Sequence, residues 1–303
     1  MAGAARAFVV VQRLLPKRAL TAVVHWLARL KVPFVSRALI GGFVRCYAVD
    51  LGEAAEPAAG GYTDFNDFFT RALRPGARPV AGGARTLTSP CDGTVSERGA
   101  IDGERLLQAR LAAKSRYYTL RQLLGEDGGA ADFIGGDFAT IYLAPYNYHR
   151  VHMPLSGTLT GIRHLPGTLF SVNAATAAAL PGLFARNERV VCRFDTGSGP
   201  LAVIFVGALN VGSIALVGLG DLTPARPRRA RSIAVPAPAV TFARGGELGR
   251  FNMGSTVILL LPAGSCRWAP GFTVGAPVRM GAAIGELTGR ATEADGGELA
   301  ARR

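Results

Sequence analysis

Residues 249–262 read GRFNMGSTVILLLP and join a glycine-containing turn to one of the strongest apolar runs of the chain. The six residues 256–261 are β-branched or aliphatic, and a short run of this kind bounded by turn residues is typical of a buried strand. Gly254 and Ser255 stand directly before that strand. On its own, a Gly-Ser-Thr triplet in this position indicates only a turn that enters a strand.

The chain from residue 86 onward keeps this texture of short apolar runs separated by glycine, proline and aspartate. Runs of β-branched and aromatic residues of this length favour strands, and the frequent turn residues favour hairpins between them. We expect strands at residues 138–143, 190–194, 201–206, 211–217 and 256–261. The pattern predicts a mostly antiparallel β domain.

The first 60 residues follow a different period. Apolar residues recur every three or four positions over residues 17–31 and again over residues 35–47, which is typical of amphipathic helices. A short helix is expected at residues 64–73, with Thr63 or Asp64 as its N-cap. The predicted fold class is therefore α+β, a mostly antiparallel β domain with amphipathic helices at its N-terminus.

The amphipathic helices have two interpretations. A basic helix that carries a tryptophan, here Trp26, can lie in the interface of a bilayer. Alternatively, its apolar stripe packs on the protein's own core. The apolar runs at residues 8–15 and 257–262 are much shorter than the roughly 20 residues that a spanning helix needs, so we expect any membrane attachment to be peripheral.

The formal net charge of +13 is compatible with a nucleic acid or an anionic lipid surface as partner, but an excess of arginine can also reflect the base composition of the genome, and the charge alone decides little. The sequence has no zinc-finger spacing, RNP-type strand or helix-turn-helix pattern, and we expect no nucleic-acid partner. The four cysteines are far apart and form no CxxC pair, which predicts free thiols in a reducing compartment.

Two further stretches contain residues that can act with Ser255. Residues 148–154 read YHRVHMP and place His149 and His152 three positions apart, in a chain with only four histidines. Residues 89–94 read SPCDGT and place Asp92 in a turn. Each stretch alone has an ordinary structural explanation. Together they suggest a catalytic site with a serine nucleophile, because a histidine can take the proton of a serine hydroxyl and an acid can orient that histidine.

Blocks spread over nearly the whole chain resemble the phosphatidylserine decarboxylase family, and its bacterial type most. In chain order they are FNDFFTRALRPGARP, SPCDGTVS, YHRVHMPLSG, LPGTLFSVN, LFARNERV, GALNVGSI and GELGRFNMGST. The resemblance implies a pyruvoyl-dependent carboxy-lyase of phospholipid biosynthesis that cuts its own chain and converts phosphatidylserine to phosphatidylethanolamine. It also implies a membrane-associating helical segment over residues 1–60 and a β-rich catalytic domain over residues 61–303.

The resemblance assigns roles residue by residue. The bond between Gly254 and Ser255 matches the family's self-cleavage site, and Asp92, His152 and Ser255 match its cleavage triad. Cleavage would give a large chain, 1–254, and a small chain, 255–303. Ser255 would become the pyruvoyl cofactor, which forms a Schiff base with the substrate, and His149 matches the histidine that acts as acid or base in decarboxylation. No metal is expected.

The departures from the family's pattern leave these reacting groups in place. Met253 stands where leucine is usual, residues 244–247 read RGGE in place of a lysine-led run, and Cys91 stands where alanine is common. The spacing of the two histidines adds an expectation about structure. A flat strand would point them to opposite faces, so two histidines that serve one site require residues 148–152 to form a turn or an irregular strand end.

Three other functions compete with this interpretation. A serine hydrolase that uses Asp92, His152 and Ser255 without self-processing would lack the GxSxG turn. A non-catalytic protein of the membrane surface leaves the matching triad unexplained. A metal site at His149 and His152 lacks acidic or thiolate partners at ligand spacing.

The resemblance also implies partners and a location. The substrate would be phosphatidylserine in an anionic membrane, and the large and small chains of one precursor would remain together. A homodimer and a peripheral position on the cytoplasmic face of the bacterial inner membrane are implied in the same way.

Overall fold

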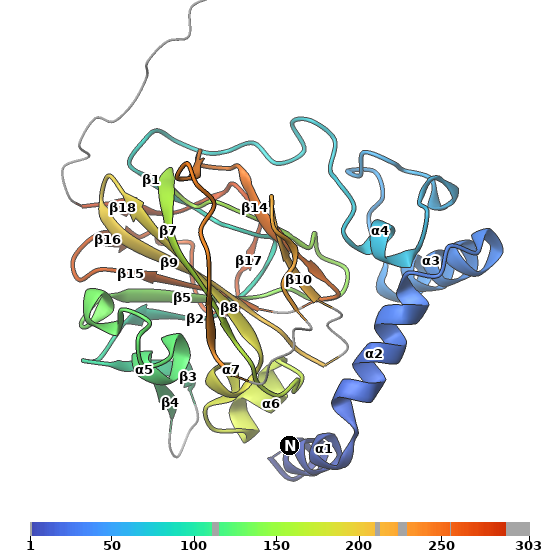
Figure 1. Ribbon diagram of the computed structural model, residues 1–303, viewed down its shortest axis with the longest axis horizontal. Helices are drawn as coiled ribbons and strands as arrows, with labels where there is room; N and C mark the ends of the chain where they lie inside the picture. The colour runs from blue at the N-terminus through green and yellow to red at the C-terminus, as the bar shows by residue number, and fades with distance from the viewer. Residues whose placement is uncertain (1, 111–114, 210–212, 224–228, 255, 289–303) are drawn as a thin grey trace, which may run out of the picture.

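The computed structural model describes residues 2–110, 115–209, 213–223, 229–254 and 256–288, except for the side chains of residues 2–6 and 18. Long helices occupy the first part of the described chain, and antiparallel sheets with short helices follow from residue 86 (Figure 1). The predicted α+β class is confirmed. In Figure 1 the N-terminal helices run along one side of the sheets.

The helices predicted at residues 17–31 and 35–47 are present with ends within a few residues of those bounds. The described α-helices are α1 (Ala2–Leu14), α2 (Lys17–Ala28), α3 (Pro33–Tyr47), α4 (Phe65–Phe69), α5 (Leu120–Leu124), α6 (Ala174–Ala179) and α7 (Leu183–Arg186). Two short 3-10 turns are η1 (Ala59–Gly61) and η2 (Ala130–Phe133). No helix in the described ranges combines the length and the apolar character that crossing a membrane requires.

Helix α1 falls within the helical segment that the resemblance implies over residues 1–60, although its run of three valines favours a strand locally. Contacts made after folding override that preference. The side chain of Gln12 accepts a hydrogen bond from the backbone N–H of Ser171 at 2.8 Å and donates one to Thr176 in α6. Helix α1 therefore lies against a segment more than 150 residues away in the sequence.

Helix α4 has the predicted N-cap and a shorter extent than predicted. The carboxylate of Asp64 accepts a hydrogen bond from the backbone N–H of Asp67 at 2.8 Å, which satisfies a donor of the first turn. The helix ends at Phe69, and Leu73 instead forms an antiparallel bridge with Ala54. The predicted range of 64–73 is thus too long, since its last residues pair with the loop that follows α3.

All the strand pairs described are antiparallel, as expected. The first half of the strands comprises β1 (Thr86–Thr88), β2 (Gly93–Ala100), β3 (Arg105–Ala109), β4 (Arg116–Thr119), β5 (Asp137–Tyr142), β6 (Arg150–His152), β7 (Gly157–Leu165), β8 (Arg189–Thr196) and β9 (Gly199–Val206). The second half comprises β10 (Ser213–Leu216), β11 (Gly220–Asp221), β12 (Arg231–Ile233), β13 (Thr241–Phe242), β14 (Glu247–Asn252), β15 (Thr256–Leu261), β16 (Cys266–Trp268), β17 (Pro277–Val278) and β18 (Ala283–Leu287).

The five predicted strands correspond to β5, β8, β9, β10 and β15; residues 211 and 212 of the fourth prediction lie outside the described residues. The largest sheet has the order β12-β7-β8-β9-β15-β5-β2-β17, with β13 beside β7. Strand β15 lies inside this sheet and is buried along its whole length. A second sheet has four strands in the order β11-β10-β14-β6. After its strand β14, the chain turns and continues into β15 of the large sheet.

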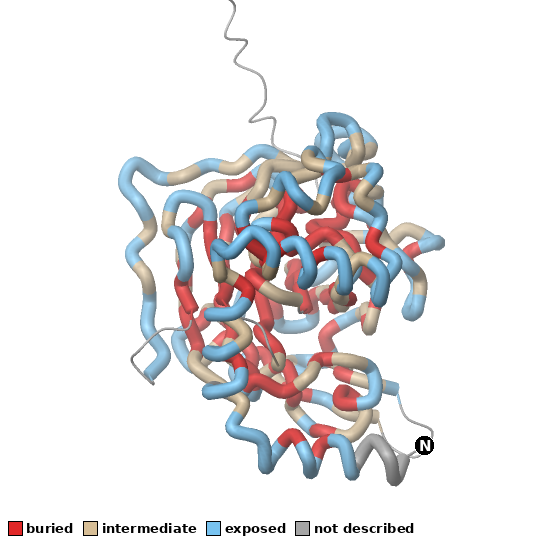
Figure 2. Tube along the Cα trace, turned by 90° about the vertical axis from the view of Figure 1, so that its right-hand side faces the viewer, coloured by how far each residue is buried: buried red, intermediate tan, exposed pale blue. Residues whose placement is uncertain are grey.

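The described core has two parts. The larger cluster fills the space around the nine-stranded sheet, and Figure 2 shows the buried residues gathered in the interior of the molecule. The smaller cluster joins helices α2, α3 and α4 through the buried residues Ala28, Ile40, Val49, Phe65, Phe68 and Phe69. Met253, from the turn between β14 and β15, packs on this smaller cluster. The N-terminal helices therefore contact the segment that the sequence analysis singled out.

Candidate active site

The chain crosses from the four-stranded sheet to the nine-stranded sheet between Asn252, the end of β14, and Thr256, the start of β15. Met253 has a φ of +93°, which a residue with a long side chain adopts only at a cost in free energy. Ser255 lies outside the described residues. The predicted cleavage site is therefore described from the Gly254 side.

His149 lies against this turn. It directly precedes β6, and its fully buried ring stacks on Phe69 of α4 with 4.0 Å between ring centroids. A Cβ placed on Gly254 would lie 3.0 Å from Nε2 of His149, which is closer than ordinary contact. A glycine therefore allows the turn to approach the imidazole. The structure brings these two predicted site residues together.

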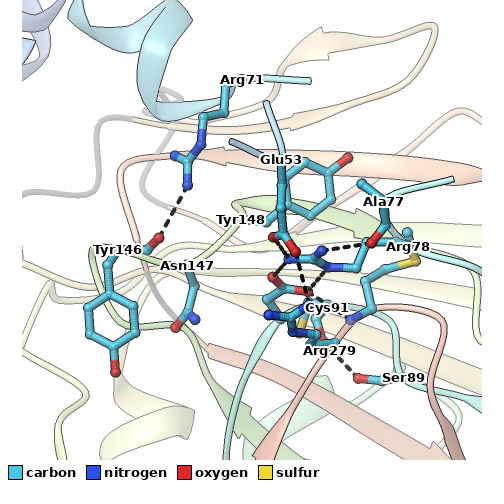
Figure 3. A network of polar contacts seen from close by, with 12 residues as sticks. Glu53, Arg71, Ala77, Arg78, Ser89, Cys91, Tyr146, Asn147, Tyr148 and Arg279 are labelled. Atoms are coloured by element: carbon cyan, nitrogen blue, oxygen red, sulfur yellow. Dashed lines mark hydrogen bonds and ion pairs between the residues drawn. The ribbon is translucent and has the colours of Figure 1, made fainter. Parts of the chain in front are cut away.

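The imidazole of His149 is neutral in this environment. Burial lowers its pKa from 6.5 to about 3, and the nearby guanidinium of Arg71 adds to the effect while the backbone of Asn147 opposes it. Neither ring nitrogen makes a hydrogen bond of good geometry within the described part of the chain. Arg71 is itself buried and donates to the carbonyl oxygen of Tyr146 at 3.2 Å (Figure 3). Apart from the interaction with the Asn147 backbone, no described residue occupies the ring nitrogens of His149.

His152 is the last residue of β6, and both of its ring nitrogens are engaged. Nδ1 lies 2.8 Å from the carbonyl oxygen of Gly245, and Nε2 lies 3.0 Å from the hydroxyl of Tyr148. A carbonyl oxygen can only accept, so Nδ1 carries the hydrogen and Nε2 accepts from Tyr148 in the neutral ring. Burial lowers the pKa of His152, and the Gly245 carbonyl partly offsets this. The contacts therefore fix the tautomer whose Nε2 has the basic lone pair.

Asp92 follows β1 in a turn and binds a different partner from the one predicted. Its two carboxylate oxygens accept hydrogen bonds from Arg78, at 2.9 Å from Nε and 2.6 Å from Nη2. One of them also accepts from the backbone N–H of Met280 at 2.8 Å. Glu53 bridges the same Arg78 to Arg279, at 2.9 Å in each case, and Figure 3 shows these arginines around Glu53.

The predicted triad is therefore only partly assembled among the described residues. No hydrogen bond joins Asp92 to His152, although the charge of Asp92 is close enough to favour the protonated form of His152. The sequence predicts that Asp92 orients the imidazole of His152. In the structure the carbonyl oxygen of Gly245 does so. The expected irregular strand end is present, because His149 lies just before β6 and His152 is its last residue, where the register of β6 with β14 shifts.

A cavity of about 230 Å³ opens beside the turn. Its lining includes Gly254, Met253, Phe69 and Tyr142. An apolar groove of about 430 Å³ adjoins it between α2 and α3, and the two share Phe43, Tyr47 and Met253. An elongated molecule with a polar end and an apolar tail would fit this arrangement.

Sequence reasoning missed several residues of the site. Arg78, Tyr148 and Arg71 lie within the blocks that carry the resemblance, yet arginine and tyrosine are common enough that residue type alone does not single them out. Gly245 acts through its carbonyl oxygen, which no sequence pattern reveals. Within the described ranges, no group of three or more His, Cys, Asp or Glu residues is arranged to hold a metal ion.

A mixed fold with a buried, neutral histidine against Gly254, next to the strained Met253 and beside a cavity, has the features of an enzyme active site. A model of the family described as "Phosphatidylserine decarboxylase" matches residues 65–286, and one described as "PSD" matches residues 7–48. The chain belongs to the phosphatidylserine decarboxylase family.

Curated relatives named "Phosphatidylserine decarboxylase proenzyme" match over nearly their full length. The relative from Methylococcus capsulatus is 47% identical over 92% of this chain and 96% of its own length. The one from Saccharophagus degradans is 43% identical over 92% and 97%, and the one from Acidovorax ebreus is 47% identical over 94% and 99%.

Proposed function

We propose that this protein cuts its own chain between Gly254 and Ser255, converts Ser255 to a pyruvoyl group, and then decarboxylates phosphatidylserine to phosphatidylethanolamine. The observation that carries the proposal is the buried imidazole of His149, which lies against Gly254 next to the strained Met253 and to which no described side chain hydrogen-bonds. Membership of the family supports it, as does the word "proenzyme" in the relatives' names. The alternative of a serine hydrolase without self-processing has no support from these relatives.

His152 is the proposed base for self-cleavage. Its Nε2 takes the hydroxyl proton of Ser255, and the Oγ forms a bond to the carbonyl carbon of Gly254. The C–N bond then breaks and the nitrogen takes the proton, which gives an ester. The negative charge of Asp92 favours the protonated His152 that forms in the first step, and this supports a role for Asp92 that needs no direct hydrogen bond.

The second stage of cleavage removes the Cα proton of Ser255 and expels Gly254 as a carboxylate, which separates chains 1–254 and 255–303. The dehydroalanine left at residue 255 takes up water and releases ammonia, leaving a pyruvoyl group. Strand β15 supports a lasting association of the two chains. It belongs to the small chain and pairs with β5 and β9 of the large chain inside the nine-stranded sheet.

The residues around Gly254 fit a pyruvoyl group, because the cavity beside it has room for a small headgroup and no described side chain hydrogen-bonds to the ring of His149. The group would supply a ketone that takes up the substrate amine and withdraws electrons from its Cα. His149 would deliver a proton to that carbon after carbon dioxide leaves. A neutral ring must first gain this proton, and the carboxylate and phosphate of an incoming substrate would raise its pKa.

Residues 1–60 are proposed as a peripheral membrane contact and residues 61–303 as the catalytic domain. Thirteen of the nineteen exposed large apolar residues in the described ranges lie within the first 47 residues, which supports a lipid contact over packing on the core. An acyl chain in the groove between α2 and α3 would bring its headgroup to the cavity beside Gly254. An anionic membrane, the cytoplasmic face of the inner membrane and a homodimer complete the proposal.

Denaturing electrophoresis of purified protein, followed by an assay of carbon dioxide release from phosphatidylserine vesicles, tests the proposal. We expect two chains and decarboxylation from the wild type. We expect one full-length chain and no carbon dioxide from Ser255→Ala. A wild-type chain that stays whole on long incubation, or Ser255→Ala protein that still releases carbon dioxide, would contradict the proposal.

A further inference from the structure

We propose that Asn252 and Met253 are positioning residues that hold the turn before the cleavage site in a strained conformation and thereby drive the first step of self-cleavage. This inference rests on the proposed function and explains why the Gly254–Ser255 bond is the one that reacts. An amide is more stable than an ester, so the shift of the Gly254 acyl group from nitrogen to oxygen needs a driving force.

Asn252 is fixed by side chains from three other segments. Its Nδ2 donates to Oδ1 of Asp221 at 2.9 Å and also to the hydroxyl of Ser213, and its Oδ1 accepts from Nδ2 of Asn66 at 3.2 Å. The side chain is buried. Asp221 in turn accepts from Arg29, the residue that follows α2, at 3.1 Å. The last residue of β14 is therefore tied to α4, β10 and β11 and cannot shift without breaking several hydrogen bonds.

Met253 is fixed from the other side by apolar contacts. Its side chain packs on the cluster of α2, α3 and α4, beside Phe43 and Phe65. Among the described residues, Met253 and Ala48 are the non-glycine residues with positive φ. Ala48 has a φ of 49° at the end of α3, within the usual left-handed region, whereas the +93° of Met253 lies beyond it. Strain of this kind persists only where the surroundings hold the residue in place.

The acyl shift gives this strained turn freedom to relax. In the amide, one atom, the nitrogen, joins the Gly254 carbonyl carbon to Cα of Ser255. In the ester, two atoms, Oγ and Cβ, join them, which adds one rotatable bond. The proton that leaves Oγ ends on the freed nitrogen, so the step is balanced. Strain stored at Met253 is thus released as the ester forms, and it opposes the return to the amide.

A matched pair of substitutions separates strain from packing. Met253→Ala and Met253→Gly both remove the side chain, but glycine adopts a positive φ without cost and alanine does not. We expect Met253→Gly to self-cleave roughly 5- to 30-fold more slowly than Met253→Ala, the factor that corresponds to the cost of one left-handed residue. Equal rates for the two variants, or faster cleavage by Met253→Gly, would overturn the inference.

A second measurement uses uncut protein, with Ser255→Ala in both variants. At an ordinary backbone position, replacing alanine by glycine lowers stability because the unfolded chain gains freedom. Here the relief of strain opposes that loss, and we expect a urea midpoint for Met253→Gly at least as high as for Met253→Ala. A clearly lower midpoint would mean that Met253 stores no strain.

The role of Asn252 is tested by measuring whether its substitution and that of Met253 have additive effects on the cleavage rate. We expect Asn252→Ala to slow cleavage, and we expect Met253→Gly to slow it little further in that background, because both changes remove the same strain. Arg250→Ala, a half-exposed position of the same strand, is the control and should cleave at the wild-type rate. Independent effects of the Asn252 and Met253 changes would contradict a shared role. Wild-type protein that does not cleave would instead refute the proposed function itself.

Discussion

Arg78 donates two hydrogen bonds to the carboxylate of Asp92, at 2.9 Å from Nε and 2.6 Å from Nη2, and both side chains are only 7% exposed. A carboxylate held in this bidentate way is fixed in orientation as well as in charge. Because Asp92 also accepts from the backbone of Met280, it connects the segment before β2 to the C-terminal part of the chain. Asp92 therefore has a structural role besides the catalytic one proposed for it.

Replacing Arg78 by alanine should destabilise the fold. The substitution leaves a buried carboxylate without its cation, and such a loss typically costs about 3–5 kcal/mol in the free energy of unfolding. Urea unfolding of the uncut Ser255→Ala protein, with and without Arg78→Ala, measures the difference. The control is Arg279→Ala, whose side chain is 67% exposed, and which should cost less than about 1 kcal/mol. Similar losses for the two variants would refute the assigned role of the buried pair.

Replacing Tyr148 by phenylalanine should change the pH dependence of self-cleavage. The Tyr148 hydroxyl donates to Nε2 of His152 and so stabilises the neutral ring; without it the pKa of His152 rises. A base with a higher pKa stays protonated up to a higher pH, so the acid limb of the cleavage rate should move upward in pH. Rates of cleavage measured across pH for both proteins test this.

The control for that experiment is Tyr146→Phe, at an exposed tyrosine of the same turn, whose profile should match the wild type. An unchanged acid limb in Tyr148→Phe would mean that the hydroxyl does not act on the base that limits cleavage.

The stability of the uncut protein should fall as the pH drops from about 6.5 toward 3. The pKa of His149 is about 3 in the fold and near 6.5 in the unfolded chain, so the unfolded state binds the extra proton in this window. The contribution of one such group is a slope of at most about 1.4 kcal/mol per pH unit. Urea unfolding of Ser255→Ala at several pH values should show a shallower slope when His149→Phe is added. Parallel slopes would contradict a buried neutral His149.

Substitution of His149 should affect decarboxylation and not self-cleavage, which is assigned to His152. His149→Ala should leave self-cleavage intact, because His152 with its Gly245 and Tyr148 contacts is unchanged. Decarboxylation should fall by at least about 100-fold, the usual contribution of a positioned acid or base. Electrophoresis reports cleavage and carbon dioxide release reports decarboxylation in one preparation. Loss of both activities in the His149 variant would refute this division.

The main elements of the fold could be predicted because their signals are local. The run Thr256–Leu261 is β15 to the residue, and the apolar period of residues 17–31 and 35–47 gave α2 and α3. The bounds of helix α1 could not be predicted from periodicity, since its valines favour a strand and its contact with α6 depends on a distant segment. The end of α4 was missed for a similar reason, because Leu73 pairs with Ala54.

The site could be predicted in its residue types and less well in its contacts. Sequence placed His149 and Gly254 in one site, and the structure brings them together. It also assigned Asp92 to His152, whereas Arg78 binds the carboxylate and the Gly245 carbonyl binds the imidazole. A backbone carbonyl leaves no mark in a sequence, and a competing arginine is visible only once the chain is folded. The role of Asp92 in cleavage remains a prediction.

The mass of the small chain tests the central claim most directly. Purified wild-type protein, denatured and measured as intact chains, should give a large chain ending at Gly254 and a small chain beginning at position 255. The small chain should be lighter by one ammonia than a peptide that begins with serine, because a pyruvoyl group has replaced the amino end. A single full-length mass, or a small chain that retains its N-terminal serine, would contradict the account.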